Sequence, residues 1–182
     1  MNKHYESKIA SEQIFNGKII NVTRDEVLLE NGAHSYREVV HHNGGAAVIA
    51  IDENDNITLI KQYRYPADCE LVEIPAGKLE KDENPFGAAK RELAEEAGIV
   101  ADTYIDLGFI IPTCGYCSEK IFIYAAKGLH TVPQHLDIDE FVTVFTMPLA
   151  LAVDAVMQNE IKDSKTAIAI LKLKQLKDEN KF

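Results

Sequence analysis

The stretch Gly77–Ile99, GKLEKDENPFGAAKRELAEEAGI, contains the residues that decide the fold. Asn84 is a favoured N-cap residue, and Pro85 suits the first helical position, where no backbone N–H is needed. Gly98 can end the helix because glycine readily adopts the left-handed conformation that follows many helices. The residues between them are mostly good helix formers. The stretch therefore predicts a helix that begins after Asn84 and ends before Gly98.

One face of this predicted helix carries a cluster of acids. Glu92 and Glu96 are four residues apart and Glu95 is three residues from Glu92, so their side chains share a face. An apolar stripe beside this face consists of Phe86, Ala89, Leu93 and Ala97. Three neighbouring carboxylates repel one another, and a divalent cation would relieve that repulsion. Because all of these ligands are oxygens, the cluster indicates a hard ion, Mg²⁺ or Mn²⁺.

The same stretch resembles the Nudix box. In that pattern G, five residues, E, seven residues, REU, one residue, EE, one residue and GU follow one another, where U is aliphatic. Every fixed place is filled here, by Gly77, Glu83, Arg91, Glu92, Leu93, Glu95, Glu96, Gly98 and Ile99. The alternative is a solvated acidic helix that matches by accident, and so many matches at fixed spacing argue against it.

Composition limits the class of protein. The chain has 182 residues, of which 46% are hydrophobic and 26% charged, as in one globular domain or one domain with an extension. No apolar run approaches the roughly 20 residues of a membrane span, and the first residues have no signal-peptide core. Three cysteines without framework spacing suit the reducing cytoplasm. The net charge of −10 argues against nucleic-acid binding, and it would repel a phosphate substrate unless metal ions reversed the local field.

The remaining sequence predicts strands, then the helix, then strands and two more helices. Residues 1–45 are predicted to form a small antiparallel sheet with a hairpin turn at Asn31-Gly32. The run AAVIAI predicts a buried strand, and further strands are predicted at 57–66, 71–77, 103–111, 120–126 and 141–146. One C-terminal helix is predicted from Pro148, and another is capped by Asp163 or Ser164 with Leu171 toward the core. This order predicts a mixed α+β fold, with an N-terminal strand region at 1–45 and a second domain at 46–182.

Segments outside the box resemble the ADP-ribose pyrophosphatase branch of the Nudix family. They are YREVVHHNGGAAVIA, KQYRYP, EIPAGKLE, GYCSEKIFIYAA, DEFVTVF and NEIKDSKTAIAIL. The resemblance implies an α/β/α sandwich with a mixed sheet and Mg²⁺-dependent hydrolysis of a nucleoside diphosphate sugar, with two or three ions per site. ADP-ribose, split into AMP and ribose 5-phosphate, is the first substrate it implies. It also implies a homodimer in which the N-terminal strands pack across the interface.

The resemblance also implies roles for residues in and beside the box. Glu92 and Glu96 would be the main metal ligands, and Ala76 would offer its backbone carbonyl. Glu95 would belong to the same metal cluster, either as a direct ligand or as a residue that contacts a ligand. It would also be one of the catalytic residues. Arg91 would hold the carboxylates by charge-assisted hydrogen bonds.

A general base is needed to activate water, unless a metal does so. The resemblance places this base in the loop LDIDEF, before the last strand. Glu140 is the first candidate, and it is also a candidate metal ligand. Asp139 and Asp137 are the alternatives. Glu83 lies before the helix, and we expect it to pair with Arg91 or to stabilise the helix N-terminus.

Four residues outside the box are candidates for substrate binding. Arg64 could reach the phosphates or the terminal ribose, and Arg37 is a second candidate cation. Tyr116 could stack on adenine, and Glu119 matches an acid of this branch. Cys114 stands where the branch usually has proline, so the loop that carries it could be reshaped and the sugar selectivity changed.

Two alternatives stay open. Within the same chemistry, the substrate could be GDP-mannose, ADP-glucose or a dinucleoside polyphosphate. From a different class, the chain could be a non-catalytic module that binds ADP-ribose or regulates a partner. Degenerate boxes mark such modules, and the box is intact here.

Overall fold

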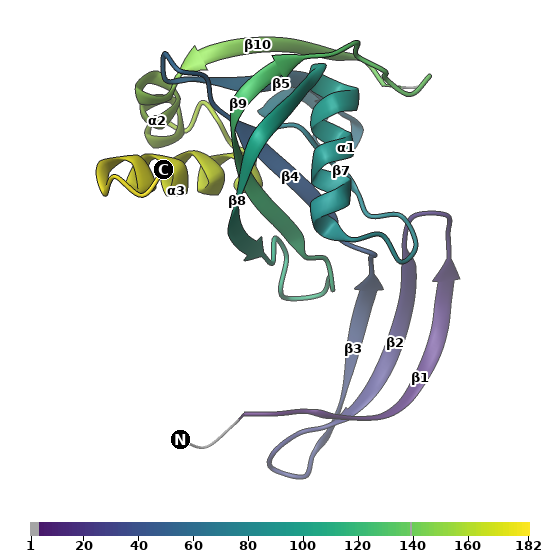
Figure 1. The fold of residues 1–182 in the computed structure, drawn as a ribbon. Coiled ribbons are helices and arrows are strands. Elements are labelled where there is room, and N and C mark those ends of the chain that lie inside the picture. The colour runs from purple at the N-terminus through teal and green to yellow at the C-terminus, as the bar shows by residue number, and fades with distance from the viewer. Residues whose placement is uncertain (1–3, 139) are drawn as a thin grey trace. The chain divides into compact units, whose positions relative to one another are not determined.

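The computed structural model describes residues 4–138 and 140–182 of the chain (Figure 1). The strands are β1 (Ser7–Asn16), β2 (Asn21–Leu28), β3 (His34–His41), β4 (Gly45–Ala50), β5 (Asn56–Arg64), β6 (Cys69–Glu73), β7 (Ala76–Lys78), β8 (Ile99–Ile110), β9 (Ile121–Thr131) and β10 (Val142–Pro148). The helices are α1 (Pro85–Ala97), α2 (Leu149–Met157) and α3 (Ser164–Asp178), with a short 3₁₀ turn, η1 (Tyr65–Ala67).

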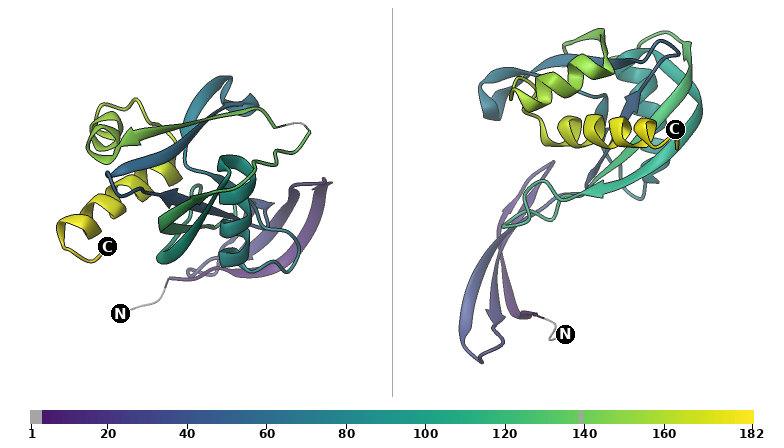
Figure 2. Two further views of the ribbon diagram at one scale, coloured as in Figure 1. Left: turned by 45° about the horizontal axis from the view of Figure 1, so that its top comes forward. Right: turned by 90° about the vertical axis from the view of Figure 1, so that its left-hand side faces the viewer.

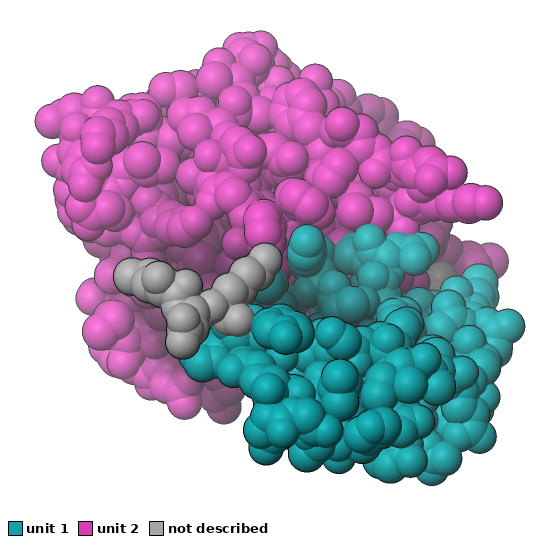
Figure 3. Space-filling model, turned by 90° about the horizontal axis from the view of Figure 1, so that it is seen from below, with its two compact units in different colours: residues 1–44, 111–120 teal, residues 45–110, 121–182 magenta. Residues whose placement is uncertain are grey.

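The chain divides into two compact units, which Figure 3 colours separately. Unit 1 combines residues 1–44 with the distant segment 111–120, and unit 2 holds residues 45–110 and 121–182. The predicted strand region ended at residue 45 and did not include that distant segment. Backbone hydrogen bonds attach the segment to β3, because Val40 donates to Tyr116 (2.7 Å) and Ser118 donates to Val40 (2.9 Å).

Unit 1 is built on an antiparallel sheet in the order β1-β2-β3. The predicted turn at Asn31-Gly32 joins β2 to β3, and Gly32 has a φ of 80°, which glycine adopts without steric penalty. Every residue of β1 is exposed within the single chain. Its large apolar side chains include Ile9, Ile14 and Phe15.

Unit 2 contains a mixed sheet in the order β7-β4-β9-β8, in which β4 and β9 run parallel. Every residue of β4 is buried, because the sheet is covered on both faces (Figures 1 and 2). Ala47 and Ile49 pack in a cluster with residues of α2 and α3. Ala46 and Val48 pack on the other face with residues of α1. The apolar run in β4 therefore reflects burial on two faces, and the layers form the predicted α/β/α sandwich. A second sheet has the order β10-β5-β6 and is antiparallel.

Helix α1 begins and ends where the sequence predicts. The Asn84 side chain accepts a hydrogen bond from the Phe86 amide (2.9 Å), and Pro85 is the first helical residue. Gly98 follows the helix with a φ of 65°, and its amide donates to the Ala94 carbonyl (3.1 Å). Both ends depend on local chemistry, which explains why the sequence predicts them well.

Helix α3 differs from the prediction on its buried face. Asp163 is the N-cap and accepts from the Thr166 amide (3.0 Å). Leu171 was expected to point toward the core but is 41% exposed. The buried face instead consists of Lys165, Thr166, Ala169, Ile170 and Leu173. The spacing of apolar residues predicted the wrong buried face because a lysine and a threonine occupy the observed one, where their polar groups are hydrogen-bonded.

None of the helices in the described ranges has the length and apolar character that crossing a lipid bilayer requires.

Candidate functional site

The site begins where β7 passes beneath helix α1 in unit 2. Gly77 lies so close to the helix that a Cβ added there would be 1.8 Å from Oε1 of Glu92. The conflicting atoms are the end of the Glu92 side chain, not backbone. A glycine at this position therefore leaves the space that the Glu92 carboxylate occupies.

Two of the three clustered carboxylates are buried. Glu92 is 7% exposed and Glu96 is 3% exposed. The Ala76 amide donates to Oε2 of Glu96 at 2.7 Å. Burial, together with the charges of Glu92 and Glu140, raises the pKa of Glu96 to about 8, against the lowering effect of the Ala76 amide. Burial also raises the pKa of Glu92, although Arg91 opposes this.

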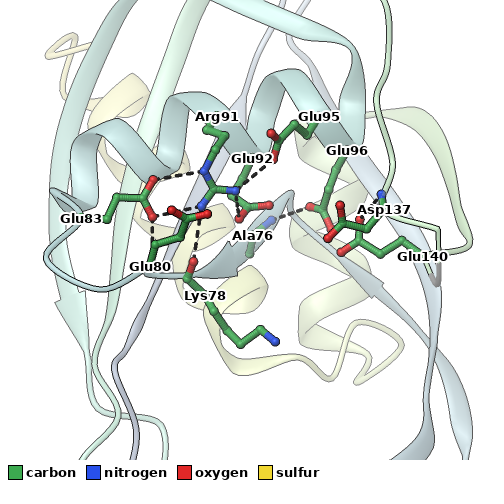
Figure 4. Close-up of polar contacts among 10 residues, drawn as sticks. All are labelled: Ala76, Lys78, Glu80, Glu83, Arg91, Glu92, Glu95, Glu96, Asp137 and Glu140. Carbon is green, nitrogen blue, oxygen red and sulfur yellow. Dashed lines mark hydrogen bonds and ion pairs between the residues drawn. The ribbon is translucent and has the colours of Figure 1, made fainter. Parts of the chain in front are cut away.

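Arg91 is the centre of the polar contacts in Figure 4. Its Nη1 donates to Glu92 (2.7 Å) and to Glu95 (2.9 Å). Its Nε and Nη2 each donate to Glu83 at 3.1 Å, and Nη2 also reaches the Lys78 carbonyl at 3.4 Å. Hydrogen bonds to Glu83 are the main reason that the pKa of Arg91 is raised. The guanidinium thus ties the loop before the helix to two of the acids on it.

The acid loop, of which the structure describes residues 136–138, 140 and 141, lies beside the buried acids. Glu140 donates its amide to the Asp137 carbonyl (3.0 Å), and the Asp137 amide donates to Oε2 of Glu140 (3.2 Å). The Glu140 charge acts on both Glu92 and Glu96, and Figure 4 draws Glu140 and Asp137 next to Glu96. Asp139, the other candidate base, lies outside the described residues.

In the part of the chain that the structure describes, no three His, Cys, Asp or Glu side chains form a ready-made metal site. Glu92 and Glu95 turn toward Arg91, and Glu96 turns toward the Ala76 amide. The donor set nevertheless fits a hard divalent cation, because it offers only oxygens and includes the buried carboxylate of Glu96, which has no cationic partner at hydrogen-bond distance among the described residues. Binding would require the acids to rotate away from these partners.

Arg64 belongs to an ion-pair network centred on buried Glu73. Its Nε and Nη2 both donate to Glu73 at 2.7 Å, which is the bidentate arrangement that guanidinium and carboxylate favour. Lys165 of α3 also donates to Glu73 (2.5 Å) and lies 3.0 Å from Asp163. The Glu96 charge contributes to the raised pKa of Arg64, behind the Glu73 hydrogen bonds. Arg64 is therefore near the acid cluster, with two nitrogens already engaged.

The other substrate-binding candidates lie in unit 1. Arg37 donates to both carboxylate oxygens of Glu6. Glu119 lies 3.3 Å from the His42 ring. Tyr116 is 59% exposed, and Cys114 is an exposed free thiol.

Sequence analysis missed two members of the ion-pair network and the role of one glycine. Glu73 lies in the quoted segment EIPAG, and Lys165 lies in KDSKT. Nothing local distinguishes these charges from surface charges, since they meet only through tertiary contacts between β6 and α3. Gly77 was noticed as a motif position, but its contact with Glu92 required the packing of β7 under α1.

Two family models match the chain. The model described as NUDIX domain matches residues 41–169, and the model described as nucleoside diphosphate sugar hydrolase N-terminal domain matches residues 6–40. The chain is 43% identical over 173 residues to a protein of Bacillus methanolicus named methanol dehydrogenase activator, covering 93% of this chain and 94% of that protein. It is 42% identical over 175 residues to the ADP-ribose pyrophosphatase of Bacillus subtilis, covering 95% and 94%. A crystal structure of an ADP compounds hydrolase superimposes with a TM-score of 0.85 at 21% identity and covers both chains completely, which confirms the predicted fold.

Proposed function

The chain belongs to the Nudix family of hydrolases, and we propose that it cleaves the pyrophosphate bond of ADP-ribose to give AMP and ribose 5-phosphate. One observation carries the proposal: Glu92 is buried over Gly77, Glu96 is buried against the Ala76 amide, and the charge of Glu140 acts on both. The choice of ADP-ribose rests on the similarity to a protein named for that substrate.

The acids of α1 suit the binding of Mg²⁺, or alternatively Mn²⁺, in two or three positions. Glu92 and Glu96 would hold the ions together with the Ala76 carbonyl, and Glu95 would lie at the edge of the cluster. When bound, such ions neutralise charge on a diphosphate and lower the pKa of coordinated water. Arg91 keeps Glu92 and Glu95 together through its Nη1. A site with this much negative charge needs that cation to remain compact without metal.

Glu140 is the proposed general base. It lies on a loop, and its carboxylate accepts a hydrogen bond from the Asp137 amide, which restricts its rotation. It would take a proton from the attacking water, whose oxygen forms a new bond to phosphorus while the P–O bond of the anhydride breaks and the leaving phosphate keeps the electron pair of that bond. Asp137 and Asp139 remain the alternative bases.

Arg64 is the proposed cation for the substrate phosphates in unit 2. Glu73 accepts hydrogen bonds from its Nε and Nη2, and Nη1 is the nitrogen proposed to bind a substrate phosphate. Arg37, Tyr116 and Glu119 of unit 1 remain candidates for substrate binding.

A substrate panel at a fixed Mg²⁺ concentration tests the proposal. ADP-ribose, ADP-glucose, GDP-mannose and a dinucleoside polyphosphate are compared by kcat/KM, with EDTA as the metal-free control. We expect ADP-ribose to have the highest kcat/KM and EDTA to abolish turnover. A higher value for another substrate contradicts the assignment of ADP-ribose but keeps the chemistry. Tight ADP-ribose binding without turnover in Mg²⁺ indicates the non-catalytic module instead.

We also propose that the protein is a cytoplasmic homodimer. The three cysteines are free thiols, which suits a reducing compartment. The apolar side chains on β1 are exposed in the single chain, and burial against a second copy would remove them from water.

A further inference from the structure

The segment 132–135, which leads into the acid loop, is attached to the C-terminal end of helix α1 by three hydrogen bonds. The Val132 amide donates to the Gly98 carbonyl at 2.8 Å, and the His135 amide donates to the Glu95 carbonyl at 3.1 Å. Between them, Nε2 of Gln134 donates to the Glu96 carbonyl at 2.5 Å. Gln134 makes the one contact of the three that depends on side-chain identity.

These donors satisfy backbone carbonyls at the C-terminal end of α1. The last carbonyls of a helix have no partner within the helix and must find donors elsewhere. Here the segment 132–135 supplies donors to Glu95, Glu96 and Gly98. The approach is close, because a Cβ added at Gly98 would be 2.9 Å from the Val132 carbonyl oxygen. The segment 132–135 is therefore packed closely against the end of α1 and hydrogen-bonded to it.

Glu95 and Glu96 connect the proposed metal cluster to the segment that precedes Glu140. Glu95 and Glu96 present their side chains to the proposed metal cluster, and their carbonyls hold the segment that leads into Glu140. Only five residues separate Gln134 from Glu140, so a shift of this anchor moves the base. We infer that Gln134 is a positioning residue that sets the place of Glu140 relative to the acids of α1. This inference rests on the proposed function.

The expected consequence is a loss of turnover with little change in binding. Without the Gln134 amide, the loop samples positions in which Glu140 is displaced from the attacking water. Loss of one hydrogen bond of this kind changes an equilibrium about three- to tenfold, so we expect kcat to fall about three- to tenfold. KM should change less than twofold, because Gln134 is not among the residues proposed to contact substrate.

The test compares three substitutions at this position in the full-length protein, with Mg²⁺ and ADP-ribose. Gln134→Ala removes the donor, and Gln134→Glu keeps the shape but replaces the donor with an acceptor. Gln134→Lys restores a donor and should recover part of kcat. Gln175→Ala is the matched control, since the exposed side chain of Gln175 donates to Glu179 (2.6 Å) at the end of α3, and its kcat should equal that of the wild type. Retention of full kcat by Gln134→Ala overturns the inference.

A double-mutant cycle separates positioning from general stability. If Gln134 acts through Glu140, then Gln134→Ala has no further effect on kcat in a Glu140→Gln background. Multiplying effects in the double mutant would show that Gln134 acts independently of Glu140 and would overturn the inference. The inference is also overturned if Glu140→Gln leaves kcat unchanged while Gln134→Ala lowers it.

Failure of the proposed function is visible separately. If the wild-type protein hydrolyses no substrate of the panel, the proposed function fails and the inference about Gln134 fails with it. If the wild type is active and Gln134→Ala is unchanged, only the inference about Gln134 fails.

Discussion

At Gly77 the lack of a side chain determines where the Glu92 carboxylate lies. Gly77→Ala should therefore displace Glu92 and lower kcat/KM by about 10²-fold, since displacements near 1 Å have effects of that size. The fold should survive because only a flexible side chain must move. Steady-state kinetics and thermal unfolding measure the two effects.

Gly87→Ala is the matched control for this substitution. A Cβ at Gly87 meets nothing within 4 Å, and the residue lies in the first turns of α1. Alanine there should leave kcat/KM unchanged and stabilise the helix by up to about 1 kcal/mol. Equal kinetics for the two alanine variants would contradict the role given to Gly77.

Glu96 predicts a pH dependence of the metal-free protein. Its pKa is raised by burial to about 8, from an ordinary value of 4.5. The folded state therefore binds more protons than the unfolded state between those values, and the free energy of unfolding falls as pH rises from about 4.5 to about 8. In Glu96→Gln the contribution of Glu96 to this slope should disappear, so that the metal-free variant is the more stable protein at pH 8.

Although Glu96→Gln should stabilise the metal-free protein at pH 8, it should weaken both activity and metal binding. Glu96→Gln should abolish hydrolysis at saturating Mg²⁺ and should lose the increase in melting temperature that Mg²⁺ gives the wild type. Chemical unfolding across pH, with and without Mg²⁺, measures both effects. Unchanged turnover in this variant would exclude Glu96 as a metal ligand.

At the scale of elements, Glu73 joins β5, β6 and α3 through Arg64 and Lys165. Burial would raise the pKa of Glu73, but Arg64 and Lys165 together outweigh burial and hold it below the ordinary value. A lowered folded pKa stabilises the protein above the unfolded pKa near 4.5, and this stability is lost as pH falls through the folded pKa.

Glu73→Gln tests this network. Removing the Glu73 charge leaves buried Lys165 with Asp163 at 3.0 Å and leaves Arg64, whose side chain is 40% exposed, to water, so the cost should be smaller than the ~3–5 kcal/mol of a fully buried, uncompensated pair. We expect the variant to be less stable than the wild type at pH 7 and the difference to shrink below about pH 4. Urea unfolding at both pH values in EDTA measures it, and Glu70→Gln, on an exposed residue of β6, is the control. A difference that does not vary with pH would contradict an ion-pair role.

At the scale of the whole molecule, the exposed sheet of unit 1 predicts self-association. Ile14 is 55% exposed on β1, and Ile14→Asp should convert a dimer into a monomer in light scattering at micromolar concentration. Met157→Asp is the control, since Met157 is 73% exposed on α2 in unit 2. A wild-type monomer under these conditions would contradict the proposed dimer.

Local patterns predicted the elements of this molecule well. Asn84, Pro85 and Gly98 placed the ends of α1 correctly because caps depend on neighbouring residues. The run AAVIAI predicted a buried strand because apolar residues at consecutive positions need cover on both faces of a sheet. Leu171 shows where this reasoning failed, since the buried face of α3 includes a lysine whose partner, Glu73, lies 92 residues away in the sequence.

The sequence by itself determined the family, the helix that carries the acids and the spacing of those acids along it. Those properties follow from residue identity and spacing along one helix. Only the tertiary structure decided that Glu96 is buried, that Gly77 makes room for Glu92 and that Gln134 links the acid loop to α1. These contacts join segments distant in the chain, and burial and close approach exist only after β4, β7 and α1 have packed together.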